Sequence, residues 1–162
     1  MSVVRYRRWF EYEQDAHAKV FAAFESVPAE GRERAEYGQA LSWMAHLTAA
    51  RRLWLGRMGR GPAFTGDFFP ANPALAPVRA EWEEVAAQWT DFLAAADDAE
   101  IERVFEYTAF EGDRYQNRVE DILTQLFGHS LYHRGHIAQL IKTCGGVPAE
   151  TDFLFWAREK IG

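Results

Sequence analysis

The 162-residue sequence contains a single cysteine, Cys144, and no hydrophobic run long enough to span a membrane. One cysteine excludes a disulfide within the chain and is typical of a reducing compartment. The segment after Met1 lacks the apolar stretch of a secretory signal, because Arg5 already interrupts it. These features predict a soluble, cytoplasmic protein without a transmembrane segment.

Basic residues are scarce relative to acidic ones. Eighteen lysines and arginines stand against 24 aspartates and glutamates, which gives a formal net charge of −6 at pH 7. Phosphate binding needs a basic surface, so the sequence predicts no nucleic-acid partner. The sequence also contains no glycine-rich phosphate loop, no nucleophile-elbow motif and no Cys-x-x-Cys pair. Any binding or catalytic site must therefore be built from residues outside these common motifs.

Helical periodicity is the strongest pattern that the sequence does contain. The segments 6–27, 38–58, 72–98 and 117–145 each repeat apolar positions at the spacing of one helix face. The clearest row is Leu75, Val78, Trp82, Val85, Trp89, Phe92 and Ala96. Four long amphipathic helices in a chain of this length predict one all-α domain, residues 1–162, folded as a four-helix bundle.

Two connections between these helices have a distinct composition. Residues 59–71 are rich in glycine, proline and phenylalanine, and a loop this long is uncommon unless it is a lid, a binding segment or an interface. Residues 104–108 and 114–116 flank a Glu-Gly-Asp turn, which predicts a small β-hairpin or extended segment before the last long helix. Both connections permit crossovers, so the helices need not follow a simple up-and-down order.

Capping residues indicate where the third and fourth long helices begin. Asn72 followed by Pro73 is typical of a helix start, with asparagine as the N-cap and proline in the first turn. Asn117 with Glu120 three residues later has the spacing of a capping box. We therefore expect these two helices to begin at Asn72 and at Asn117.

The segment from His129 to His136 carries the most chemical information. His129, His133 and His136 share one helix face and continue a row of apolar positions that includes Leu126 and Leu140. A buried imidazole needs a partner for each ring nitrogen, which is either a hydrogen-bonding group or a divalent metal. His129 and His133, four residues apart, can bind one metal from a single helix.

A third ligand from a facing helix would complete such a site. His46 is the best candidate, because small residues share its row and leave space beside the ring. The alternative is that the histidines are core residues hydrogen-bonded to Tyr132, Gln125 or the backbone. His17 is expected to be a polar core residue or partly exposed rather than a ligand. The groups that could support the ligands are His136, Tyr132, Gln125 and Glu13. His136, one turn beyond His133, could instead be a fourth ligand or a proton shuttle.

Four sequence features occur together in this chain. They are the His-x-x-x-His-Arg-Gly motif at 129–135, the isolated His46, an N-terminal Tyr6-x-x-Trp9 and a C-terminal Thr151-Asp152-Phe153. Together they resemble the DinB/YfiT-like superfamily over essentially the whole chain. Members of that family are four-helix bundles, often dimeric, with a divalent metal held by three histidines. The resemblance implies His46, His129 and His133 as the ligands, whereas His136 replaces a common glutamine.

The resemblance also has implications for function. Characterised members include thiol-dependent S-transferases and a thiol-dependent isomerase, and a metal-dependent hydrolase role has been proposed as well. Three neutral ligands leave a divalent metal its full charge, which lowers the pKa of a bound water or thiol. We therefore expect a metal-dependent enzyme, thiol S-transferase-like or hydrolase, that acts on small molecules.

The expected cofactor is zinc or nickel, and the expected partners are a small-molecule substrate, a low-molecular-weight thiol and a second copy of the chain in a homodimer. Two alternatives from other classes stay open. One is a non-catalytic metal-binding or stress-response protein. The other is a metal-free helical interaction module.

Overall fold

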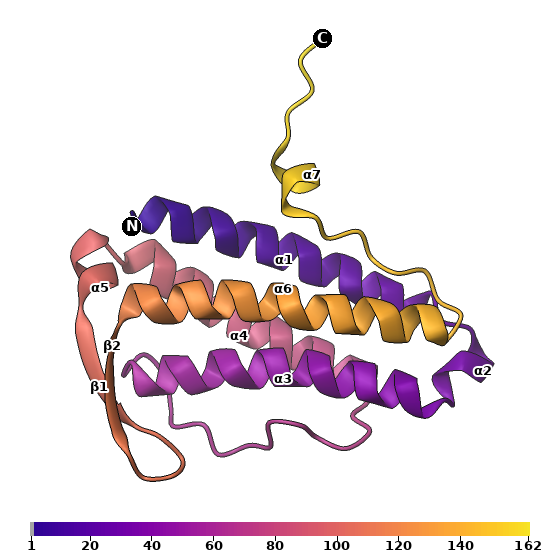
Figure 1. Cartoon of the computed structure of the whole chain (residues 1–162), viewed down its shortest axis with the longest axis horizontal. Helices are drawn as coiled ribbons and strands as arrows, with labels where there is room; N and C mark the ends of the chain where they lie inside the picture. The colour runs from indigo at the N-terminus through magenta and orange to yellow at the C-terminus, as the bar shows by residue number, and fades with distance from the viewer. Residues whose placement is uncertain (1) are drawn as a thin grey trace.

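Four long helices arranged as a bundle dominate the computed structural model, which describes residues 2–162 (Figure 1). The long helices are α1 (Val3–Glu25), α3 (Ala35–Arg57), α4 (Leu75–Ala95) and α6 (Val119–Thr143). The short ones are α2 (Ala29–Arg32), α5 (Asp98–Glu102) and α7 (Phe153–Ala157). Within residues 2–162, no helix combines the length and apolar character that crossing a bilayer requires. The predicted all-α four-helix bundle is confirmed.

The order of the helices in space differs from their order in the chain. Neighbours in the bundle follow the cycle α1–α4–α3–α6. Helices α1 and α6 run in one direction along the bundle, and α3 and α4 run in the other (Figure 1). Because α3 and α4 are parallel, residues 58–74 must return along the length of α3 before α4 can begin. The length of this loop is therefore a consequence of the topology.

A β-hairpin precedes the last long helix, as predicted. Strands β1 (Val104–Thr108) and β2 (Arg114–Arg118) pair antiparallel. Gly112 in the turn has φ of 96°, which glycine adopts without strain. At the tip, Phe110 is 72% exposed, and its ring centroid lies 5.4 Å from that of Phe68 in the loop between α3 and α4. The hairpin thus contacts the long loop.

Both predicted helix starts lie slightly too early. Helix α4 begins at Leu75, and Asn72 has φ of 48°, whereas an N-cap residue is extended. Helix α6 begins at Val119, where the Arg118 backbone N–H donates to Asp121 Oδ2 at 3.0 Å. Pairing with β1 keeps residues up to Arg118 in the hairpin. At the start of α6, strand pairing therefore overrides the local capping signal, and at the start of α4 the left-handed conformation of Asn72 excludes it as the N-cap.

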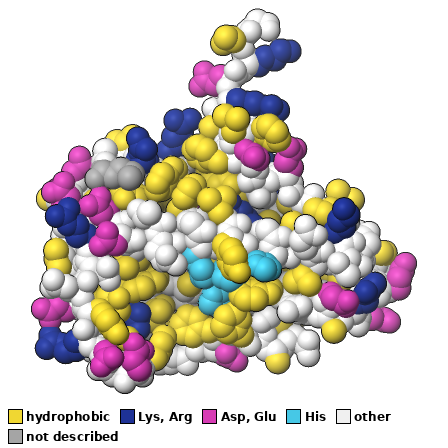
Figure 2. Space-filling model, in the orientation of Figure 1, with side chains coloured by type: hydrophobic (Ala, Val, Ile, Leu, Met, Phe, Trp, Pro, Cys, Tyr) yellow, Lys and Arg dark blue, Asp and Glu magenta, His cyan; other side chains and the backbone are white. Residues whose placement is uncertain are grey.

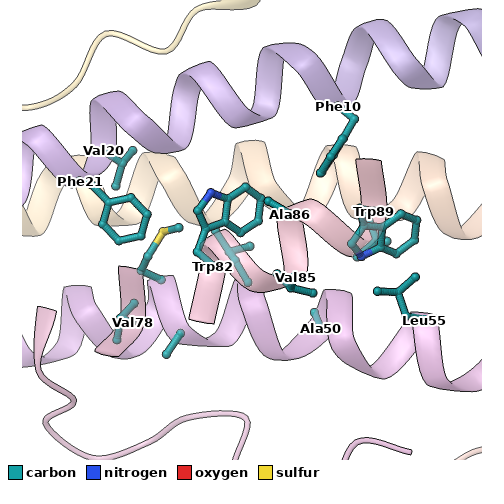
Figure 3. Close-up of a cluster of buried hydrophobic side chains, with 14 of the residues drawn as sticks. Phe10, Val20, Phe21, Ala50, Leu55, Val78, Trp82, Val85, Ala86 and Trp89 are labelled. Atoms are coloured by element: carbon teal, nitrogen blue, oxygen red, sulfur yellow. The ribbon is translucent and has the colours of Figure 1, made fainter. Parts of the chain in front are cut away.

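One face of α4 supplies much of the core (Figure 3). Every position in its predicted row is buried except Leu75, which is half-buried. The ring of Phe10 from α1 lies 6.4 Å from the rings of both Trp82 and Trp89, and Trp89 is 0% exposed. Truncating such a tryptophan to alanine costs about 3–5 kcal/mol. The aromatic row therefore anchors α4 to α1.

A buried ion pair crosses the core between α1 and α3. Glu13 and Arg51 are 1% and 4% exposed. Arg51 Nε donates to Glu13 Oε1 at 2.7 Å, and Ser130 Oγ of α6 donates to the same oxygen at 2.8 Å. The guanidinium also lies over the rings of Phe10 and Trp89. Because buried charges are stable only when paired and hydrogen-bonded, these contacts tie three helices together.

A second buried cation attaches the C-terminal segment. Arg134 is 3% exposed, and its Nη2 donates to the Tyr12 hydroxyl at 2.6 Å. That hydroxyl donates in turn to the Thr151 carbonyl. Phe153 and Trp156 pack against the Tyr12 ring with centroids 5.1 and 5.6 Å away. Tyr12 therefore links Arg134 of the histidine motif to the C-terminal Thr151-Asp152-Phe153 motif.

Replacing Glu13 by glutamine should lower the free energy of unfolding by about 3–5 kcal/mol, because Arg51 then keeps a buried charge without a counter-charge. Urea unfolding measures the change. Asp15→Asn on the same helix is the matched control: Asp15 and Lys19 form a surface pair in which the side chains are 39% and 47% exposed. It should cost less than about 1 kcal/mol. Equal losses in the two variants would contradict the role of the buried pair.

Candidate metal centre

Three histidines from two helices meet on one face of the bundle (Figure 2). His46 lies on α3, and His129 and His133 lie one turn apart on the adjacent helix α6. The Nε2 atom of His129 is 3.1 Å from Nε2 of His46 and 2.8 Å from Nε2 of His133. The structure thus brings together the three residues that the sequence singled out as ligands.

The long loop fixes the orientation of His46. His46 Nδ1 lies 3.2 Å from the Phe68 carbonyl oxygen, which can only accept a hydrogen bond. Nδ1 therefore carries the proton, and Nε2 keeps its lone pair. Phe69 stacks on the same imidazole, with centroids 4.2 Å apart and planes at 10°. A backbone carbonyl that holds the distal nitrogen is a common support for metal-binding histidines.

The contacts among the three Nε2 atoms cannot all be hydrogen bonds. His46 Nε2 offers a lone pair, and a single proton on His129 Nε2 satisfies only one of its two neighbours. A divalent cation between the three nitrogens would satisfy them all. A tetrahedral zinc site, with Zn–N near 2.0–2.1 Å, places two ligand nitrogens about 3.3 Å apart. Two observed separations, 2.8 and 3.1 Å, are close to that value, and all three ligand atoms lie within 4.8 Å of one another, so the residues present fit a metal.

Burial favours the neutral form of these imidazoles. Burial, followed by the neighbouring His46, lowers the pKa of His129 to about 4. Burial and the adjacent His129 lower the pKa of His133 to about 4 as well. Burial also lowers the pKa of His46, and the hydrogen bond to the Phe68 carbonyl opposes that shift. Because a histidine must be neutral to bind a metal, the site can accept a cation at neutral pH.

The predicted row along α6 is buried only in part. His133 is 5% exposed and His129 is half-buried, whereas His136 is exposed. The buried stripe of α6 is centred on Ser130 and Ile137, so the histidine row follows its edge. The centre therefore lies where the bundle meets solvent rather than deep in the core.

Tyr132 and His136, two of the predicted supporting groups, lie at the rim of the site. Tyr132 is 64% exposed, and its ring lies 5.1 Å from that of His133 and 4.7 Å from that of His136. His136 stacks on Trp43 with centroids 5.9 Å apart. His136 does not belong to the group whose ligand atoms converge.

Within residues 2–162, Glu13 and Gln125, the other two supporting candidates, make no hydrogen bond or ion pair to His46, His129 or His133. Glu13 is bound by Arg51, as described above. Gln125 is exposed, and within the described part of the chain it makes no hydrogen bond to a histidine. His17 is fully buried, and burial holds its pKa well below the ordinary value. Its ring packs against Trp82 with centroids 4.0 Å apart, so it is a core residue.

Sequence reasoning missed Trp43 and the Phe68 carbonyl. Trp43 stacks on His133 with centroids 4.4 Å apart and planes at 24°. Its place three residues before His46 was an available signal, because such positions share a helix face. The Phe68 carbonyl left no signal, since every residue carries one.

The fold and the histidine group define a helical-bundle protein with a candidate three-histidine metal centre. A family model described as the DinB superfamily matches residues 14–137, which is more than half of the chain and includes all three histidines. The chain therefore belongs to the DinB superfamily. No curated protein and no solved structure matches it.

The metal-free protein should lose stability as the pH falls from about 6.5 to 5. Histidines of the unfolded chain take up protons near pH 6.5, but His129 and His133 in the folded chain do so only at about 4. Stability rises with pH wherever the unfolded state binds more protons, so it is complete above pH 6.5 and decreases below it. Most carboxylates titrate below this window.

Urea unfolding of the metal-free protein across this pH window measures the dependence. The double variant His129→Gln, His133→Gln removes both depressed groups and should show a shallower slope. A slope as steep as that of the wild type would contradict the neutral burial of these two side chains.

Proposed function

We propose that this chain binds one divalent metal ion, zinc or nickel, through His46, His129 and His133, and that the metal centre acts catalytically on small molecules. The observation that carries the proposal is the convergence of three neutral imidazole nitrogens at the solvent-facing edge of two helices. Because these ligands are uncharged, a bound divalent ion would keep its full charge toward any further ligand.

A metal held there would supply Lewis acidity and lower the pKa of a bound water or thiol. The two reaction classes that fit are transfer of a low-molecular-weight thiol to an electrophile and hydrolysis of a small substrate. The residues around the site hold the candidate ligand rings in a fixed orientation. The Phe68 carbonyl holds the ring of His46, and Trp43 stacks on the ring of His133. Both contacts limit how far the ligand nitrogens can move.

The number of protein ligands favours catalysis over storage. Structural zinc sites are closed by four protein ligands, whereas catalytic sites use three and keep a position open. Within residues 2–162, three histidines form the group here, and no cysteine or carboxylate joins them. Cys144 is buried at the end of α6, and burial raises the pKa of its thiol. The homodimer and the cytoplasmic location expected from the sequence stay predictions.

Protein purified without a histidine tag and loaded with Zn²⁺ or Ni²⁺ should retain about one metal ion per chain, measured by elemental analysis. His129→Ala removes one ligand and should abolish this binding. His136→Ala is the matched control, because His136 lies on the same helix but outside the converging group. It should keep its metal. Equal metal contents in wild type and His129→Ala would overturn the ligand assignment.

The same protein, loaded with Co²⁺ instead, shows whether the bound metal has an open coordination position. Addition of 2-mercaptoethanol should change the visible absorption of the wild type, because a thiolate can enter a vacant position and soft sulfur ligands alter the metal spectrum. A spectrum that neither thiol nor azide changes would indicate a closed site, and the protein would then be a non-catalytic metal binder.

A further inference from the structure

Four side chains form a continuous arc of rings beside the candidate metal centre. Phe69 contacts Trp43 with centroids 5.4 Å apart, and Trp43 stacks on His136 at 5.9 Å. His136 contacts Tyr132 at 4.7 Å. Both ends of the arc face solvent, because Phe69 is 50% and Tyr132 is 64% exposed. We call these four residues the aromatic arc.

The aromatic arc touches the candidate ligands on two sides. Phe69 stacks on His46 with centroids 4.2 Å apart. Trp43 and Tyr132 contact His133 at 4.4 and 5.1 Å. Since the nitrogens of His46 and His133 converge with that of His129, a molecule bound at their meeting point lies within reach of the arc.

Most side chains around the arc are apolar, and the acidic Asp67, whose Oδ1 accepts from the Phe69 backbone N–H at 2.9 Å, lies at one end of it. In Figure 2 the histidines on this face are bordered mainly by hydrophobic side chains. The charged groups that influence His129 are Arg51 and Glu13, which are buried and paired with each other. The groups that influence His133 are other histidines. Exposed apolar side chains gathered at one place mark a binding surface more often than an inert one.

We propose that the aromatic arc binds a planar ring without anionic substituents, so that the substrate carries such a ring next to its anionic, metal-binding atom. This inference rests on the proposed function. A divalent centre with neutral ligands attracts one anionic atom. The arc offers ring faces and edges, which bind a second π system by stacked or edge-to-face contact. A negatively charged substituent would lose hydration there without gaining a counter-charge, because the charged group beside Phe69 is the carboxylate of Asp67.

Three hydroxamates test the proposal, because they share one metal-binding group and differ in the attached part. Benzohydroxamate carries a planar ring, cyclohexanecarbohydroxamate a puckered one and acetohydroxamate a methyl group. The Zn²⁺-loaded full chain should bind benzohydroxamate about tenfold more tightly than acetohydroxamate in titration calorimetry. The cyclohexyl compound should bind much less tightly than benzohydroxamate. Equal affinities for the two ring compounds would overturn the requirement for a planar ring.

Two tyrosine variants test whether the preference for benzohydroxamate arises at the aromatic arc. Tyr132→Ala removes one exposed end of the arc and should reduce the tenfold preference to about threefold or less. Tyr115→Ala is the control, because Tyr115 on β2 is also an exposed tyrosine, at 47%, and should leave the preference unchanged. Metal content is measured for each variant, so that lost metal is not mistaken for a lost ring contact.

The outcomes separate the two proposals. If benzohydroxamate and acetohydroxamate bind the wild type equally, or if Tyr132→Ala keeps the full preference, the aromatic arc is not a ring-binding subsite, although the metal centre stands. If neither hydroxamate binds the metal-loaded protein, the open coordination of the proposed function is wrong, and the inference is overturned with it.

Discussion

The contact between α3 and α6 is the constraint on which the site depends. It brings His46 of one helix to His129 and His133 of the other. The buried pair of Glu13 and Arg51 maintains that contact, since the carboxylate also accepts from Ser130. Ser130 is the residue after His129, so the hydrogen bond that fixes α6 against the core lies directly beside the candidate metal centre. The buried charge network and the candidate metal centre thus share one stretch of α6.

The topology of the bundle imposes a second constraint on the site, through the path of the loop between α3 and α4. Because α3 and α4 are parallel neighbours, the chain must run back along α3, and this return path carries Phe68 and Phe69 past His46. The hairpin contacts the same loop where Phe110 meets Phe68. The parallel arrangement of α3 and α4 by itself accounts for the length of this connection. Its path also sets the tautomer of one candidate ligand, His46, and places Phe69 in the aromatic surface around the candidate metal centre.

Periodicity was enough to predict the helices and the buried row of α4, because burial of one helix face imposes its own spacing on the sequence. The histidine group followed from the spacing of His129 and His133 and from the family resemblance. The exposure of His136 could not be predicted in this way. Helical spacing places a residue on a row but does not show where the buried stripe of the helix ends. The carbonyl that orients His46 and the Arg51 partner of Glu13 depend on contacts between distant segments, which no local pattern encodes.

Anomalous diffraction from crystals of the Zn²⁺-loaded protein, recorded at the zinc absorption edge, tests the central claim most directly. We expect one peak that lies about 2.0–2.1 Å from Nε2 of His46, His129 and His133, with no fourth protein ligand. A peak at another place, a peak with a fourth protein ligand, or histidine rings that stay in contact without any metal peak would contradict it.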